Sequence, residues 1–220
     1  MFKADLHCHT TYSKCSTMSP EELVRAAVSK EIGVLGVVDH DNIRGAEAVK
    51  KAAKGKILVL PGEEISTNKG HLIVFFSDGK FSKDIHEVCD RAKDIGAFVV
   101  APHPFDIARL TGIGRTLGKI RVDAVEIFNS RVIFNRFNIK AEDFAMGHKL
   151  PMIVGSDAHS PQEVGLALNI FNCGKDADSI IESIRKGKVT FVKNSSGIKG
   201  HVATLKAKAK RKIFGVGDGV

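Results

Sequence analysis

The feature that most constrains the fold of this chain is an alternation of short apolar runs with longer amphipathic stretches over its 220 residues. The apolar runs are rich in β-branched residues and predict strands at 2–6, 34–38, 57–60, 72–76, 98–101, 124–128 and 152–154, with short candidates at 168–171 and 190–193. Such alternation is typical of βα units around a parallel sheet. Periodicity leaves open whether that sheet closes into a barrel.

The stretches between these runs carry helix signals. Ser19-Pro20-Glu21-Glu22 is a capping box with proline at the first helical position, and apolar residues follow it at helical spacing. Residues 82–95 place apolar side chains on one helical face and end at Gly96, a favourable C-terminal cap. Residues 132–147 and 176–186 have similar patterns, so a helix is predicted in each.

Length and composition favour a soluble globular protein. The hydrophobic fraction is 43%, charged residues make up 26%, and no segment approaches the roughly 18 apolar residues of a membrane span. The N-terminus runs at once into a polar, histidine-rich stretch, which is unlike a secretory signal, so a cytoplasmic location is expected. The four cysteines form no C-x-x-C pair, which favours thiols over a disulfide framework. The sequence gives no indication of the oligomeric state.

The net charge of +8 is concentrated near the C-terminus. Six of the 33 Lys and Arg residues, but one of the 25 Asp and Glu residues, lie in 199–220, which leaves 27 against 24 in residues 1–198. We therefore expect a folded domain at 1–198 and a basic tail at 199–220. Such a tail either binds nucleic acid or another anionic surface, or is simply solvated.

Histidines and carboxylates follow the predicted strands. His7 and His9 come after the first strand, and residues two apart in an extended segment point to the same side. The others are His40, Glu64, His103, Asp157 and His159, while His71 instead opens its strand. The carboxyl ends of parallel barrel strands meet at one face, so these side chains are predicted to converge there. Imidazole with carboxylate suits Zn²⁺, Mn²⁺ or Fe²⁺ better than Mg²⁺.

Each motif has a structural alternative. A lone H-x-H after a strand is more often structural than metal-binding, and a single Gly-Glu-Glu or His-Pro says almost nothing. Recurrence of such motifs after successive apolar runs is what favours a metal site.

Taken together, the motifs closely resemble those of the polymerase and histidinol phosphatase (PHP) family. The matching pieces span most of residues 1–192 in the family's order: Asp5-x-His7-x-His9, Asp39-His40-Asp41, Gly62-x-Glu64, His103-Pro104 and Gly155-Ser156-Asp157-Ala158-His159. The resemblance implies an α/β fold, a distorted seven-stranded (β/α) TIM-like barrel, with a centre of two or three divalent metal ions. It also implies hydrolysis of phosphoesters.

The resemblance further implies a ligand set. By motif position, His7, His9 and Asp157 would hold one ion, and Glu64 would bridge it to a second that His103 and His71 complete. His40 and His159 would hold a third. The family usually has Asp or His shortly after the H-x-H, whereas this chain reads Ser13-Lys14-Cys15-Ser16. Either Cys15 ligates that ion as a thiolate, or it is a spectator and the third ion is weak or absent.

The expected mechanism is in-line attack on phosphorus by a hydroxide that bridges two ions, with no covalent enzyme intermediate. In this mechanism His7, His9, Glu64 and Asp157 act through the metal-bound hydroxide. Asp5 and Asp39 are expected to orient imidazoles by hydrogen bonds. Arg131 and Arg115 are the candidates for binding substrate phosphate, with a surface role as the alternative for each.

Three functions follow from these patterns. The leading hypothesis is a metal-dependent phosphatase or phosphodiesterase that acts on a small phosphorylated metabolite or nucleotide. The second is a nuclease acting on nucleic-acid ends, for which the basic tail is mild support. The third is a non-catalytic metal-binding or accessory scaffold, which would need eroded ligands.

Overall fold

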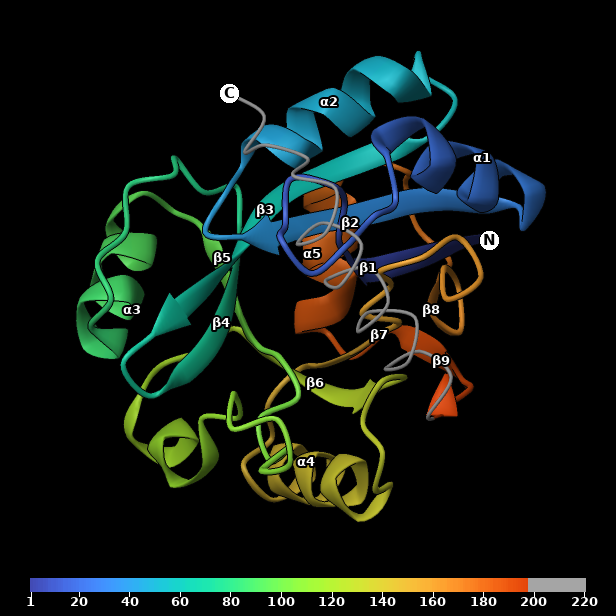
Figure 1. Ribbon diagram of the computed structural model, residues 1–220. Coiled ribbons are helices and arrows are strands. Elements are labelled where there is room, and N and C mark those ends of the chain that lie inside the picture. Colours follow the sequence, from blue (N-terminus) through green and yellow to red (C-terminus); the bar gives the residue numbers. More distant parts are fainter. Residues whose placement is uncertain (198–220) are drawn as a thin grey trace.

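Each predicted apolar run forms a strand in the computed structural model, which describes residues 1–197 (Figure 1). The strands are β1 (Phe2–Cys8), β2 (Ile32–His40), β3 (Leu58–Thr67), β4 (Gly70–Phe75), β5 (Phe98–Ala101), β6 (Ala124–Asn129), β7 (Met152–Gly155), β8 (Ala167–Phe171) and β9 (Val189–Lys193). The predicted basic tail at 199–220 lies outside the described residues, so the division at residue 198 stays a prediction.

The four predicted helices are confirmed as α1 (Pro20–Ser29), α3 (Ile85–Asp94), α4 (Arg136–Gly147) and α5 (Ala177–Arg185). Ser19 caps α1 through the predicted capping box with Glu22. Two further elements were not predicted, α2 (Arg44–Ala53) and the short 3₁₀ helix η1 (Gly114–Lys119). The buried face of α2 consists of Gly45, Ala46, Val49 and Ala53. With such small side chains the segment is only weakly hydrophobic overall, and α2 has no side-chain cap to mark its start.

The strands form one sheet in the order β7-β6-β5-β4-β3-β2-β1-β8-β9. The expectation of a parallel sheet is correct for β1–β2–β3 and β5–β6–β7, but β4 runs antiparallel to both of its neighbours. The β3–β4 pair is a tight hairpin in which Thr67 pairs with Gly70. This reversal brings the first residues of β4 to the carboxyl ends of the neighbouring strands. It therefore explains why His71 opens its strand when the other candidate ligands follow theirs.

Strands β1 to β7 form a series of seven neighbours within this sheet, and the two ends of that series meet where β1 lies beside β7. The amide of His9 donates to the carbonyl of Ala158 at 2.9 Å, and the amide of Ala158 donates to the carbonyl of His7 at 3.2 Å. Lower down, the buried side-chain amide of Asn169 on β8 joins the strands, donating to the carbonyls of Val154 at 2.7 Å and Ala4 at 3.4 Å. The sheet is thus a nearly closed mixed barrel, and the predicted distorted barrel is confirmed.

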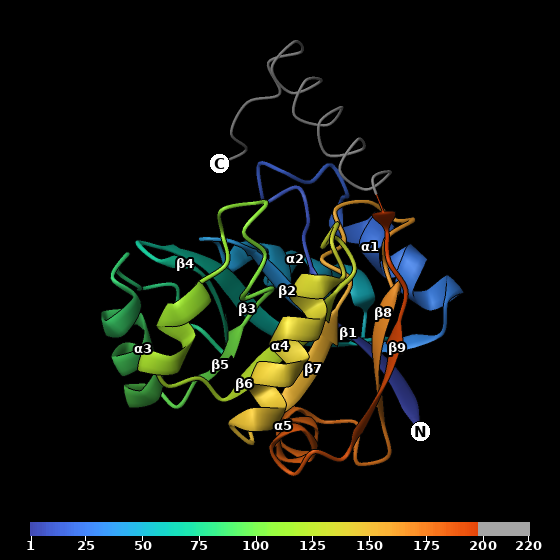
Figure 2. The ribbon, with the colours of Figure 1, turned by 90° about the horizontal axis from the view of Figure 1, so that it is seen from below.

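One end of the barrel is apolar and the other is polar. Its interior is filled by side chains from all seven strands of the series, among them Leu6, Leu60, Phe75 and Phe98. Ile180 and Ile184 of α5 join this cluster and cover one end, seen at the bottom of Figure 2. The carboxyl ends of the parallel strands lie at the other end, where the interior side chains become histidines and carboxylates. None of the helices in residues 1–197 has the length and apolar character that a membrane crossing needs.

Candidate metal centre

A bulge in β1 turns both histidines of the H-x-H motif into the barrel. Regular alternation would send His7 outward, because Leu6 packs in the barrel interior. The pairing of β1 with β2 shifts register between Asp5 and Cys8, and Cys8 packs instead in the cluster outside the barrel. His7 and His9 are fully buried as a result, with their Nε2 atoms 3.1 Å apart. The bulge thus re-aims two polar side chains at one point.

Glu64 lies at the centre of the cluster, with its two carboxylate oxygens facing different histidines. Oε1 is 2.8 Å from Nδ1 of His71 and 3.0 Å from Nε2 of His103. Oε2 is 3.3 Å from Nε2 of His9 and 3.6 Å from Nε2 of His7. Glu64 is on β3 at the same alternation as interior Leu60, so the strand itself directs the carboxylate inward. Nδ1 of His40 is also 3.3 Å from Oε2, so one buried carboxylate stands among five imidazoles.

Asp157 and His159 enter the cluster from the loop after β7. Oδ1 of Asp157 is 3.2 Å from Nε2 of His9 and 3.6 Å from Nε2 of His7. Asp157 has a φ of 54° and His103 a φ of 31°, values in the left-handed region that non-glycine residues rarely adopt. Such strained backbone occurs mostly at functional sites, where the surrounding structure holds it in place.

Hydrogen bonds on the far side of the imidazoles fix which nitrogen faces the cluster. Nδ1 of His7 lies 2.9 Å from Oε1 of Glu126, and Nδ1 of His9 lies 3.3 Å from the hydroxyl of Ser13. That hydroxyl donates to Asp39 at 2.6 Å, so it accepts from His9. With both Nδ1 atoms donating, the Nε2 lone pairs face each other. Two such lone pairs at 3.1 Å repel unless a proton or a cation lies between them.

The electrostatics of the cluster depend on its buried charges. Burial alone would lower the pKa of His7, but Glu126 and Asp157 raise that pKa well above its usual value. Burial would raise the pKa of Glu64, yet the surrounding histidines, His71 first, hold it well below the usual range. The pKa of His40 falls to about 4, chiefly through burial. Without metal, the carboxylates therefore stay ionised and hold protons on part of the histidine cluster.

The spacing of the donor atoms fits a divalent cation. Ligands at about 2.0–2.2 Å from a tetrahedral ion lie roughly 3.3–3.6 Å from one another. The distances among Nε2 of His7 and His9 and their carboxylate partners are 3.1, 3.2, 3.3, 3.6 and 3.6 Å. Among the described residues, three groups have ligand atoms within 4.8 Å of one another: His7 with His9 and Glu64, His40 with Glu64 and His71, and His9 with Cys15, His40 and His159. Buried groups of this kind are consistent with metal binding.

Comparison with known proteins agrees with this geometry. The model of the PHP domain matches residues 5–106, and a model described as PHP-associated matches residues 135–189. An uncharacterized protein of Methanocaldococcus jannaschii is 34% identical over 177 residues, which cover 75% of this chain and 68% of that protein. The chain belongs to the PHP family.

Two other matches are more limited in what they show. A structure from Bifidobacterium adolescentis, provisionally described as a metal-dependent phosphoesterase, superposes with a TM-score of 0.61 over 93% of this chain and 96% of that one, at 16% identity. At that identity the likeness concerns the fold. A 5'-3' exoribonuclease of Haemophilus influenzae is 46% identical over 67 residues, which are 30% of this chain and 24% of the enzyme.

Two residues that join the cluster were not predicted from the sequence. Glu126 is fully buried on β6 and holds both Nδ1 of His7 and, at 2.8 Å, the backbone amide of His103. Its signal was a charged residue inside an apolar strand. Arg109 donates to Oδ2 of Asp157 at 2.6 Å and to Asp106 at 2.7 Å. It lies in the loop after β5, where no pattern distinguished it.

The arginines predicted to bind phosphate and the aspartates predicted to orient imidazoles differ in how they relate to the cluster. Arg131 is buried, donates to Glu163 at 2.5 Å, and is close enough to His159 to help depress the pKa of that imidazole, after burial and His9. Arg115 is exposed on η1 and, within residues 1–197, makes no hydrogen bond or ion pair with the cluster. Asp39 was expected to orient an imidazole, and it does so indirectly, through the hydroxyl of Ser13, which contacts His9. Asp5 instead accepts from backbone amides, among them Gly165 at 2.7 Å, and so fixes loops and not imidazoles.

Proposed function

We propose that this PHP protein is a metal-dependent phosphoesterase that hydrolyses small phosphorylated metabolites or nucleotides. The observation that carries the proposal is the position of Glu64, whose Oε2 faces His7 and His9 while its Oε1 faces His71 and His103. A buried carboxylate whose two oxygens face different imidazoles is the arrangement a bridging ligand needs. It supports the assignment of these residues to a centre with two or three ions.

The donor set also bears on the choice of metal. Imidazole nitrogens outnumber carboxylate oxygens around Glu64, which favours Zn²⁺, Mn²⁺ or Fe²⁺ over Mg²⁺. When bound, such ions neutralise phosphate oxygens and acidify a bound water so that it can attack phosphorus near neutral pH. The chain's own contribution is to hold His7, His9, Glu64 and Asp157 at fixed separations. Glu126 and Ser13 keep the Nδ1 protons on the far side of the two imidazoles.

Arg131 is the better of the two arginines for contact with substrate phosphate. Its guanidinium is held by the buried carboxylate of Glu163, which also accepts from the amide of His159 at 2.9 Å. Arg131 is therefore anchored beside one of the candidate ligands, and a preorganised arginine suits phosphate oxygens. Arg115 would reach substrate only if substrate extended to η1.

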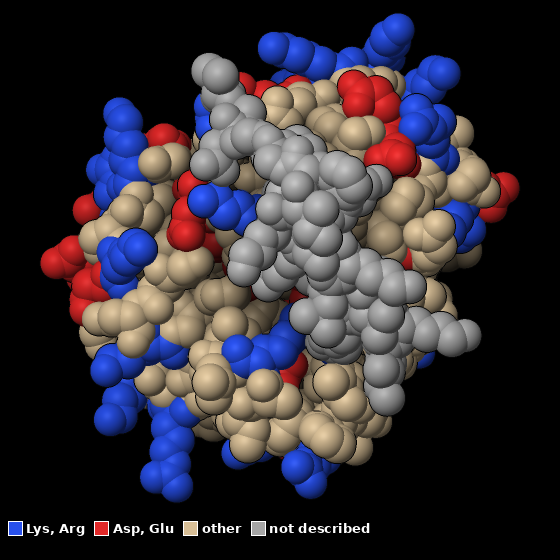
Figure 3. Space-filling model, viewed as in Figure 1, with Lys and Arg blue, Asp and Glu red and all other residues tan. Residues whose placement is uncertain are grey.

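A nuclease acting on nucleic-acid ends is the second candidate, favoured by the 46% identity over 67 residues to the exoribonuclease. On the visible part of the face drawn in Figure 3, lysines and arginines project mainly around the periphery, with acidic side chains among them. The scaffold alternative needs eroded ligands, whereas the cluster around Glu64 is complete in its residue types.

The test is a substrate panel assayed with Mn²⁺, Zn²⁺, Fe²⁺ and Mg²⁺ in turn. The panel comprises p-nitrophenyl phosphate, its diester, nucleotides and short 5'-labelled oligonucleotides, with the full chain and with a chain lacking residues 199–220. We expect the wild type to hydrolyse a small phosphoester. His7→Ala and Asp157→Ala should each abolish this activity and reduce the amount of bound metal.

The matched control is His86→Ala, because His86 is exposed on α3 outside the cluster and its loss should leave activity intact. Preferential cleavage of the oligonucleotides would favour the nuclease. Bound transition metal near zero after growth in supplemented medium, together with no turnover of any substrate, would favour the scaffold. Full activity in both purified cluster variants would contradict the proposed site.

A further inference from the structure

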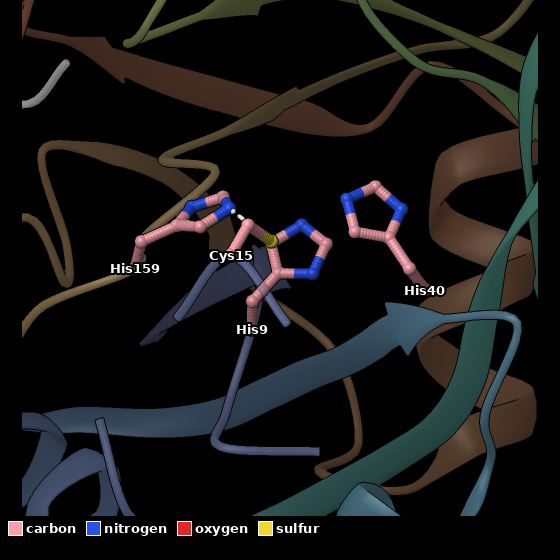
Figure 4. A group of neighbouring side chains, drawn as sticks. All are labelled: His9, Cys15, His40 and His159. Atoms are coloured by element: carbon pink, nitrogen blue, oxygen red, sulfur yellow. Dashed lines mark hydrogen bonds between the residues drawn. The ribbon is translucent and has the colours of Figure 1, made fainter. Parts of the chain in front are cut away.

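The position after the H-x-H motif brings a thiol, not a carboxylate or imidazole, to the cluster. Figure 4 shows Cys15 gathered with His9, His40 and His159, side chains that come from different segments of the chain. The four ligand atoms lie within 4.8 Å of one another, and Sγ of Cys15 is 3.0 Å from Nε2 of His159. Cys15 is therefore one member of a set of metal-ligating side chains.

The loop that carries Cys15 is tied down on both sides of the thiol. The hydroxyl of Ser16 donates to the carbonyl of His159 at 3.0 Å and to that of His9 at 3.3 Å. On the other side, the hydroxyl of Ser13 donates to Asp39 at 2.6 Å and accepts from the amide of His40 at 2.9 Å. Ser13 and Ser16 are both buried, so the thiol between them is positioned by the fold.

His9 belongs with the neighbouring group of ligands. Its Nε2 already faces two carboxylates, Asp157 at 3.2 Å and Glu64 at 3.3 Å, whereas His40 faces one, Glu64, at 3.3 Å from its Nδ1. We therefore assign Cys15, His40 and His159 as a set of three. Nδ1 of His159 lies 2.7 Å from the carbonyl of Asp157 and can only donate to it, so Nε2 is the nitrogen that accepts. Three protein ligands with one open position are typical of catalytic zinc sites, in which cysteine and histidine occur together.

We propose that Cys15, as a thiolate, joins His40 and His159 in a three-ligand site that selects Zn²⁺ or Fe²⁺ over Mg²⁺ and Mn²⁺. This inference rests on the proposed metal-dependent function and deepens it by naming the metal class of one position. Thiolate is a soft ligand that suits zinc and iron, whereas carboxylate and water suit magnesium and manganese. Sγ of Cys15 lies 3.0 Å from Nε2 of His159, the nitrogen free to accept, so one ion can contact both atoms.

The test is optical and does not depend on turnover. Full-length protein stripped with a chelator is titrated with Co²⁺, which reports a cysteine ligand through a near-ultraviolet thiolate-to-cobalt absorption band. We expect the band in the wild type and in Cys89→Ser, a half-buried thiol on α3 outside the cluster that serves as the matched control. Cys15→Ser should lose the band. Its Zn²⁺ affinity should also fall by more than roughly 100-fold, the upper end of the loss expected when only an outer hydrogen-bond partner of a ligand is removed.

A second variant separates a ligand role from a folding role. Cys15→Asp replaces the sulfur ligand by a carboxylate oxygen, so it should lack the band but still take up an ion, with Mn²⁺ now favoured relative to Zn²⁺.

The outcomes keep this inference distinct from the proposed function. Persistence of the band in Cys15→Ser would overturn the thiolate assignment. Wild-type protein that hydrolyses phosphoesters and binds cobalt without the band would also overturn it, while the proposed function would stand. Wild-type protein that binds no divalent ion under any condition would refute both.

Discussion

Glu126→Gln is the substitution that most sharply tests how the cluster is held together. Glu126 is fully buried, with Oε1 at 2.9 Å from Nδ1 of His7 and Oε2 at 2.8 Å from the amide of His103 and 2.9 Å from Nδ2 of Asn129. Glutamine has nearly the same shape but one oxygen and one NH₂ group. Because two donors already point at the Oε2 position, the glutamine oxygen must stay there and the NH₂ must face His7.

The consequence is a change of tautomer at His7. An NH₂ group can only donate, so Nδ1 of His7 would have to accept and the imidazole proton would move to Nε2. A protonated Nε2 is not a metal ligand. Loss of an outer partner of this kind typically costs about 10- to 100-fold in metal affinity, or about 1.4–2.7 kcal/mol. We expect a loss of this size for Zn²⁺ or Mn²⁺ in Glu126→Gln.

Metal affinity is measured by competition with a chromophoric chelator on protein first stripped of metal. Circular dichroism of the stripped proteins checks that the variant is folded. The matched control is Glu142→Gln, because Glu142 is only partly buried on α4, where it pairs with Lys193 at 2.8 Å, and its loss should not change affinity. A folded Glu126→Gln protein that binds metal as tightly as the wild type would refute this account of His7.

Two further predictions concern the packing and the charge of the cluster. Gly155→Ala should destabilise the fold by about 1–3 kcal/mol in urea unfolding, because its Cβ would lie 2.1 Å from Oε1 of Glu126 and 2.5 Å from Cβ of His7. Gly147→Ala, with no atom within 4 Å of its Cβ, is the control and should not destabilise. Burial would raise the pKa of Asp157, but His7 and Arg109 hold it well below the usual range. The ionised carboxylate therefore stabilises the metal-free fold at pH values above its unfolded pKa of about 3.9. This stabilisation is lost as the pH falls below that value. The free energy of unfolding lost in Arg109→Gln should therefore be largest at neutral pH and shrink in acid. Arg115→Gln is the control. A loss that does not depend on pH, or an equal loss in Arg115→Gln, would contradict the pairing of Arg109 with Asp157.

Much of the fold could be predicted because local patterns and global packing agree. Each apolar run became a strand, since β-branched residues at alternating positions can fill the barrel interior and contact the outer helices at the same time. The direction of β4 could not be predicted, because periodicity is the same for parallel and antiparallel strands. Helix α2 was missed because the side chains on its buried face are small and no side-chain cap marks its start.

The candidate site shows a similar limit. Motif order indicated which histidines and acids would meet, but not how their rings are oriented. That orientation comes from the bulge in β1, from Glu126 and from Ser13, none of which belongs to a recognisable motif. Arg109 reaches Asp157 from a loop 48 positions away in sequence, and such a contact leaves no local pattern.

The central claim is that His7, His9 and Glu64 hold a divalent cation in common. The most direct measurement is anomalous X-ray diffraction from crystals of the full-length protein grown with Zn²⁺ or Mn²⁺, recorded on both sides of the metal absorption edge. We expect an anomalous peak within bonding distance of Nε2 of both histidines and of Oε2 of Glu64. Ordered side chains with no peak between them, at a metal concentration that fills sites elsewhere on the molecule, would contradict it.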